Sequence, residues 1–180
     1  MQRIKLGLTL ALLSFLIACE EDPATQVERG WQLFESGDFL EARSAFMNAA
    51  TSGSTDAYNG LGWSYLRLDS ISEARIAFAF ASSDSNPEIY AGWSSANVLS
   101  EDFQKALEKS AVVLRQDANF VFSHDTDVDY KDMIWQRAYC YYHLGQYALS
   151  LQEIQKISPD FNSVNPSDIL NKLESLSNEL

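Results

Sequence analysis

The chain has 180 residues, of which 46% are hydrophobic and 12% aromatic, and its formal net charge is −12. This composition supports a folded core of about one domain rather than a disordered tail. Glycine and proline are sparse, with 8 and 4 residues, which favours helices over a turn-rich β-sandwich. The acidity argues against nucleic acid as a partner, because binding a phosphate backbone requires clustered Lys and Arg.

The first residues have the pattern of an export signal. Arg3 and Lys5 form a positive start, and an apolar run of about 12 residues follows from Leu6 to Ile17. A membrane-spanning helix needs about 20 apolar residues, so this run is too short to be one. The run leads into residues 16–19, which read Leu-Ile-Ala-Cys.

This tetrapeptide resembles the bacterial lipobox, in which a peptidase cuts before the cysteine and the new N-terminus carries a diacylglyceryl thioether. The resemblance implies a signal peptide over residues 1–18, lipidation of Cys19 by acyl chains such as palmitate, and an acidic tether over residues 19–23. Several acyl chains would make a lasting membrane anchor. No Asp follows Cys19 directly, which by resemblance favours the outer membrane, on its periplasmic or surface face. The alternative is an ordinary secretory signal that happens to contain a cysteine.

Residues 24–180 contain a pattern that recurs at an interval of about 32 residues in its first two steps. An aromatic residue or Leu-Gly marks the first half of each unit, and small and apolar residues mark the second half. The units align through Leu33, Gly37, Ala42 and Phe46; Leu61, Gly62, Ala74 and Phe78; Trp93, Asn97, Ala106 and Val113; and Ala138, Leu144, Ser150 and Ile154. These residues resemble the tetratricopeptide repeat, a helix-turn-helix unit. The resemblance implies an all-α solenoid of about four repeats.

The turns inside the repeats are not uniform. Gly37 and Gly145 indicate turns, because glycine just after a helix takes the left-handed conformation that caps the last carbonyls. The second and third repeats have Asp69 and Glu101 at this place and so depart from the pattern. Further departures from the expected small or aromatic residues are Ser94, Ser110 and Ser150.

Two segments extend the repeat array. Pro166 to Leu180 carries Leu and Ile at three-to-four spacing, which predicts a C-terminal capping helix with Ser167 as its N-cap. Between the third and fourth units the interval grows to about 44 residues through an insertion around Asp117 to Asp132. We expect this insertion to loop out on an exposed face or to lengthen the flanking helices.

In tetratricopeptide repeats the first helix of each unit lines a concave groove, and the family's groove positions can be transferred to this chain. The predicted partner-binding groove comprises Trp31, Phe34, Asn59, Trp63, Arg67, Trp135, Tyr139, Tyr142 and His143. Large aromatic side chains dominate interface energetics, which favours an envelope protein or peptide segment as partner. Because Val27 and Trp31 occupy positions where carboxylate-clamping members use Lys and Asn, an apolar peptide or helix is the expected ligand. Alternatively, these aromatic residues pack between neighbouring repeats.

The residues that could carry chemistry are few. Cys140 and His143 lie three apart on one predicted helix, but no orienting acid or oxyanion element accompanies them, so we predict no catalytic site. The carboxylates of Asp125–Asp129 resemble the start of a calcium loop, yet Tyr130 and Gln136 replace its Gly and Glu. We therefore predict no cofactor and no metal. A second hypothesis stays open: an accessory lipoprotein that binds a glycan or small ligand in the groove, with calcium in the acidic segment.

Overall fold

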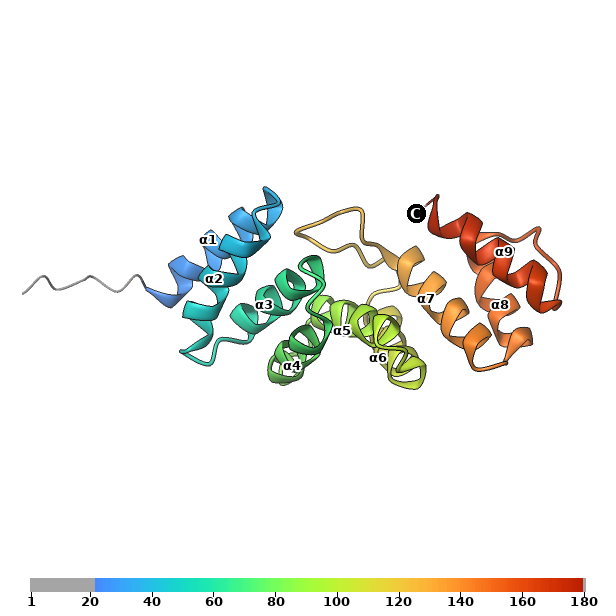
Figure 1. The fold of residues 1–180 in the computed structure, drawn as a ribbon, viewed down its shortest axis with the longest axis horizontal. Helices are drawn as coiled ribbons and strands as arrows, with labels where there is room; N and C mark the ends of the chain where they lie inside the picture. Colours follow the sequence, from blue (N-terminus) through green and yellow to red (C-terminus); the bar gives the residue numbers. More distant parts are fainter. Residues whose placement is uncertain (1–21, 180) are drawn as a thin grey trace, which may run out of the picture.

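The structure is a computed structural model that describes residues 22–179, so the predicted signal peptide and Cys19 lie outside the described residues. The described residues form nine α-helices and one isolated β-bridge. The helices are α1 (Pro23–Glu35), α2 (Phe39–Ala50), α3 (Thr55–Arg67), α4 (Ile71–Ala81), α5 (Pro87–Leu99), α6 (Phe103–Gln116), α7 (Tyr130–His143), α8 (Tyr147–Ile157) and α9 (Pro166–Ser177). They follow one another along a curved arc (Figure 1). No helix between residues 22 and 179 is long and apolar enough to cross a membrane.

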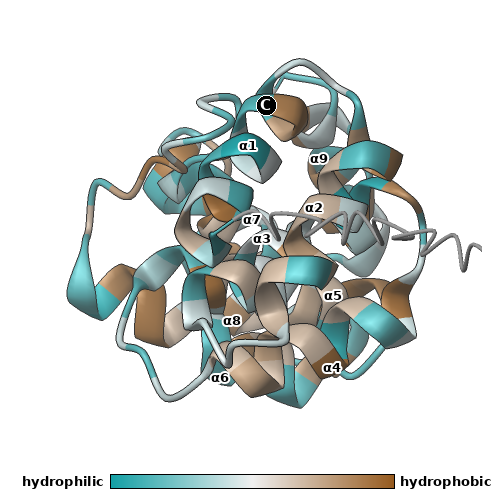
Figure 2. Ribbon diagram, turned by 90° about the vertical axis from the view of Figure 1, so that its left-hand side faces the viewer, coloured by the Kyte–Doolittle hydropathy of each residue, from teal (hydrophilic) through white to brown (hydrophobic). Residues whose placement is uncertain are grey.

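Four helix hairpins, α1–α2, α3–α4, α5–α6 and α7–α8, make the repeats, and α9 closes the array. The prediction of an all-α solenoid of four repeats with a capping helix is therefore confirmed. α9 packs on α7 and α8 and buries Ile169, Leu173 and Leu176. Its N-cap is Asn165, whose side chain accepts from the Ser167 N–H, so the expectation of Ser167 as N-cap was wrong by two positions. Figure 2 shows hydrophilic and hydrophobic residues interspersed along the helices, as expected for helices that each bury one face.

The four turns inside the repeats share one geometry despite their different residues. Gly37, Asp69, Glu101 and Gly145 all have positive φ, at 84°, 55°, 57° and 71°. Each turn is closed by the same type of backbone bond, as in Asp38 N–H to the Leu33 carbonyl at 2.9 Å. The Asp and Glu therefore accept the left-handed conformation that glycine adopts without strain, because the repeat geometry demands it.

Two phenylalanines fill the spaces between neighbouring repeats. The Phe46 ring lies against Gly30 of its own repeat and against Gly60 of the next one, and a Cβ at either glycine would overlap the ring. Phe78 meets Gly92 in the same way one repeat later. Because both rings are fully buried, the small residues on the first helix of each repeat are what allows the repeats to stack closely.

The serine departures from the repeat pattern form hydrogen bonds to backbone carbonyls, across a helix pair for Ser94 and Ser150 and within α6 for Ser110. Ser150 Oγ donates to the Ala138 carbonyl at 2.8 Å, and Ser94 Oγ lies 3.1 Å from the Ala106 carbonyl. Ser110 Oγ donates to the same Ala106 carbonyl, at 2.9 Å. All three hydroxyls are buried and hydrogen-bonded, so these substitutions leave the fold intact.

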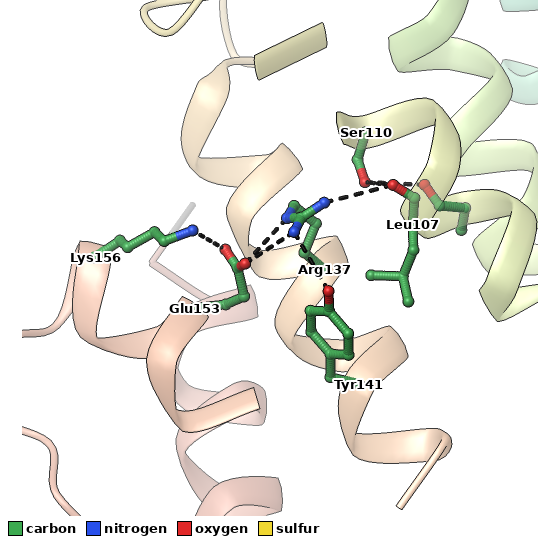
Figure 3. A network of polar contacts seen from close by, with 7 residues as sticks. Leu107, Ser110, Arg137, Tyr141, Glu153 and Lys156 are labelled. Carbon is green, nitrogen blue, oxygen red and sulfur yellow. Dashed lines mark hydrogen bonds and ion pairs between the residues drawn. The ribbon is translucent and has the colours of Figure 1, made fainter. Parts of the chain in front are cut away.

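The third and fourth repeats are joined by a polar network, shown in Figure 3. Arg137 stands where the second repeat has Leu61. Its Nε and Nη2 donate to Glu153 Oε1 at 3.1 and 3.0 Å, and its Nη1 donates to the Leu107 carbonyl at 3.4 Å. Lys156 Nζ donates to the other Glu153 oxygen at 2.6 Å. An ion pair thus connects α7 and α8, and a hydrogen bond connects α7 to α6, at a position where the second repeat has the apolar Leu61.

Candidate functional site

The insertion between α6 and α7, residues 117–129, folds back into the concave side of the arc (Figure 1). We call it the groove hairpin. Phe122 N–H donates to the Val128 carbonyl at 2.9 Å, and Tyr130 N–H donates to the Phe120 carbonyl at 2.8 Å. Both phenylalanines are buried, so the expectation that the insertion loops out was wrong. The physical reason is that burying such a ring contributes about 1.5–3 kcal/mol.

The groove hairpin covers the predicted groove residues of the first two repeats. The Phe122 ring stacks on Trp63, with ring centroids 4.2 Å apart and planes at 16°. It also meets Trp31 and Phe34 edge-on, at 6.1 and 6.0 Å. Trp31, Phe34 and Trp63 are consequently only 6%, 3% and 3% exposed. The structure brings these three predicted residues together, but around a side chain of the same protein.

Polar contacts hold the tip of the groove hairpin to three helices. They join His124 Nδ1 to Glu35 Oε1 (2.8 Å), Asp125 to Arg67, and the Ser123 N–H to Glu88 Oε1 (3.1 Å). The His124 ring also stacks on Trp31 at 3.7 Å with parallel planes. Exposed ion pairs contribute only about 0–1 kcal/mol each, so the phenylalanines supply most of the attachment.

Asn59, another predicted groove residue, is buried one helical turn before Trp63 on the same face of α3. Neither its side-chain nitrogen nor its side-chain oxygen has a hydrogen-bond partner among the described residues. A buried amide in this state disfavours the fold by about 1–3 kcal/mol. Asn59 is therefore a polar group that the covered groove leaves unsatisfied.

The remaining predicted residues, Trp135, Tyr139, Tyr142 and His143, form a second cluster on α7. Trp135 stacks on Tyr139 at 5.1 Å, and Trp135 Nε1 donates to the Leu173 carbonyl of α9 at 2.9 Å. The Tyr139 ring lies 4.3 Å from His143, which is exposed and stacks on Phe103 at 4.8 Å. Trp135, Tyr139 and Tyr142 are half-buried against the core that α7 shares with α9, and His143 is the exposed member of the cluster.

A pocket of about 220 Å³ lies beside the groove hairpin, where α3, α5 and α7 meet on the concave side. Its lining residues are Trp63, Leu66, Arg67, Ser95, Leu99, Val128, Asp132 and Gln136. Leu99 is 60% exposed, although it is a large apolar residue. Burial raises the pKa of Asp132, and the Asp129 N–H that donates to its carboxylate at 2.8 Å opposes the increase. Trp63, Arg67 and Leu99 lie at groove positions that the repeat pattern predicts, whereas Val128 and Asp132 were not predicted as part of this site.

The residues considered for chemistry take structural positions. Cys140 is fully buried beside Ala106 and Leu107, and burial raises the pKa of its thiol to about 12. A nucleophilic cysteine requires a lowered pKa, so this environment suits a core residue. Asp129 caps α7 by accepting from the Lys131 N–H at 2.6 Å. No group of three potential ligands placed to hold a metal ion occurs within residues 22–179.

Fold and site together define an α-solenoid of helix-turn-helix repeats with a partly self-filled concave face. Among solved structures the chain is similar to a tetratricopeptide repeat protein from Parabacteroides merdae, with a TM-score of 0.61 and 19% identity over 87% of this chain. The chain spans 60% of the length of that protein. It is also similar to YrrB, a tetratricopeptide repeat protein described as having an unusual peptide-binding site (TM-score 0.66, 17% identity, 78% of this chain and 70% of that one).

A third similar structure is MamA, with a TM-score of 0.63 and 18% identity over 77% of this chain and 74% of that one. No family model matches the sequence, and no curated protein matches it. At identities below 20% the likeness establishes the fold, a tetratricopeptide-type solenoid, and function must be argued from the site.

Proposed function

We propose that this protein is a bacterial lipoprotein, anchored to the outer membrane through Cys19, whose solenoid recruits another protein of the cell envelope. The lipobox pattern at residues 16–19 supports the anchor. α1 begins at Pro23, so the chain between the acylated residue and the solenoid spans at most about 14 Å. A partner bound by the repeats would accordingly lie close to the membrane surface.

The observation that carries this proposal is the open part of the concave face. His143 in the α7 cluster and Leu99 beside the pocket are exposed, and the other aromatic residues of the cluster are half-buried, whereas the neighbouring groove is filled by Phe122. Aromatic residues gathered on a concave surface are typical of protein-binding sites. The groove hairpin covers Trp31 and Trp63, which removes two of the aromatic surfaces on which a glycan could stack.

In-cell photo-crosslinking with mass spectrometry tests the scaffold role. A photo-crosslinking amino acid would replace Leu99 or His143 on the open concave face, or Glu108, which is exposed on α6, as the control. We expect one envelope protein to be captured from the two concave positions and not from the control. Capture that does not depend on position, or none at all, would refute the scaffold proposal.

Membrane fractionation of a Cys19→Ala variant tests the anchor separately. Loss of the acylated cysteine should release the protein from the membrane fraction, because no helix within residues 22–179 is long and apolar enough to cross a membrane. Retention of a variant whose residues 1–18 have been removed, as verified by the mass of the intact protein, would show that Cys19 is not the anchor.

A further inference from the structure

The pocket beside the groove hairpin indicates which types of residue a bound partner segment carries. We propose that it receives one apolar side chain of a partner segment whose neighbouring residues are Lys or Arg. The proposal rests on the proposed function, and it concerns a pocket whose walls come partly from the insertion. Val128 belongs to the groove hairpin and the other lining residues belong to α3, α5 and α7, so the repeats alone would leave the pocket without one of its walls.

The size and walls of the pocket select a single apolar group. Its volume of about 220 Å³ lies below the roughly 300–1,000 Å³ of sites that enclose a small-molecule ligand. Its apolar walls come from Trp63, Leu66, Leu99 and Val128. Because Leu99 is largely exposed, an entering side chain would remove its apolar surface from water. A leucine-sized side chain from a peptide fits these requirements.

The charges around the pocket favour a cation beside that side chain. Burial and the nearby carboxylates of Asp129 and Asp125 raise the pKa of Asp132, which lines the pocket. Arg67, the cation in the lining, already pairs with Asp125. A desolvated carboxylate among like charges gains more from an incoming ammonium or guanidinium group than a solvated one does. The net charge of −12 attracts basic segments over a longer range as well.

The pocket continues into the aromatic cluster along one face of α7. Asp132, Gln136, Tyr139 and His143 follow one another at helical spacing, so they lie on the same side of the helix. A segment seated in the pocket would therefore run over the Tyr139 ring. Basic side chains bind favourably to aromatic rings, which gives the flanking cations a second site of contact.

Fluorescence anisotropy with three labelled peptides tests this chemistry on the full-length protein in mild detergent. Each peptide has a Gly-Ser background and a central triplet of Lys-Leu-Lys, Lys-Ala-Lys or Glu-Leu-Glu. We expect the Lys-Leu-Lys peptide to bind about tenfold or more tightly than either of the others at low salt. Equal affinity for the Lys-Leu-Lys and Glu-Leu-Glu peptides would overturn the charge preference, and equal affinity for Leu and Ala would overturn the pocket.

Two variants and a control assign these preferences to the site. Asp132→Asn removes the charge and keeps an oxygen that can accept from Asp129 N–H, so it should abolish the preference for Lys over Glu. Leu99→Ala should weaken the preference for Leu over Ala. Glu108→Gln removes an exposed acid of α6 and should change neither. If all three variants retain the wild-type preferences, with helicity unchanged by circular dichroism, the pocket is not the binding site.

The crosslinking experiment tests the scaffold role, and the peptide experiment separately tests the chemistry of the bound segment. A partner captured from Leu99 in cells, together with peptides that show no preference, would leave the scaffold proposal standing and refute the basic-apolar segment. Peptide selectivity that depends on Asp132, without any captured envelope protein, would support the pocket and refute the scaffold role.

Discussion

Replacing Phe122 with alanine removes the ring that joins the groove hairpin to the first two repeats. The ring is fully buried and contacts Trp63, Trp31 and Phe34. Its burial is worth about 2–3 kcal/mol, and stacking on Trp63 adds about 1 kcal/mol. We therefore expect Phe122→Ala to lower the free energy of unfolding by about 3–4 kcal/mol, within the usual range for buried Phe-to-Ala changes.

Urea unfolding followed by tryptophan fluorescence measures this effect. If the groove hairpin leaves the groove, Trp31 and Trp63 become exposed, and the native emission should shift to longer wavelength with increased quenching by acrylamide. Val121→Ala is the matched control, because Val121 lies in the same hairpin and is 48% exposed. It should change stability by less than about 0.5 kcal/mol. A loss below about 1 kcal/mol for Phe122→Ala, with unchanged emission, would refute the assignment of the hairpin as an integral part of the fold.

Three further predictions concern other parts of the molecule. Glu153→Ala should lower the free energy of unfolding in urea by about 3–5 kcal/mol, because it leaves the Arg137 charge buried without a partner. Lys156→Ala removes the more exposed partner of Glu153 and should lower it by less than about 1 kcal/mol. Equal losses for the two variants would argue against the network. Glu101→Gly should raise the melting temperature, with a gain of about 0.5–1 kcal/mol from relief of the positive φ, and a loss would contradict the strain. Burial raises the pKa of the Cys140 thiol from an ordinary 9.0 to about 12, which lowers the fraction of reactive thiolate. Thiol labelling at pH 8 should therefore be at least about 1,000-fold slower in the native protein than in urea, and comparable rates would refute the burial of Cys140.

The repeat architecture was predictable because its signals are local and recur. Gly62 and Phe78 mark one unit, and the spacing located the turns even where Asp69 and Glu101 replace glycine. The conformation at these two residues was not predictable from their identity alone, since positive φ is uncommon for every residue except glycine, although Asp adopts it more often than Glu does. It follows from the geometry that the neighbouring repeats impose.

The candidate site was predictable only in part, because it depends on contacts between distant residues. The groove positions Trp31 and Trp63 were identified, but the sequence does not reveal that Phe122 covers them. A signal for this was present: Phe120 and Phe122 alternate within an otherwise acidic segment, and alternation is typical of a strand with one buried face. The acidic composition of the insertion favours a solvated loop, and this outweighed the alternation of Phe120 and Phe122 in the prediction.

The groove hairpin also changes the stiffness of the repeat array. In an open solenoid each repeat touches only its neighbours, so the end repeats can fray and the superhelix can flex like a spring. Here His124 contacts Glu35 across 89 residues, and Asp125 contacts Arg67 across 58. These contacts join the first and second repeats to the segment that connects the third repeat to the fourth, so they restrict changes in the curvature of the array. A force that pulls the two ends of the array apart would therefore act on these contacts before it could extend the solenoid.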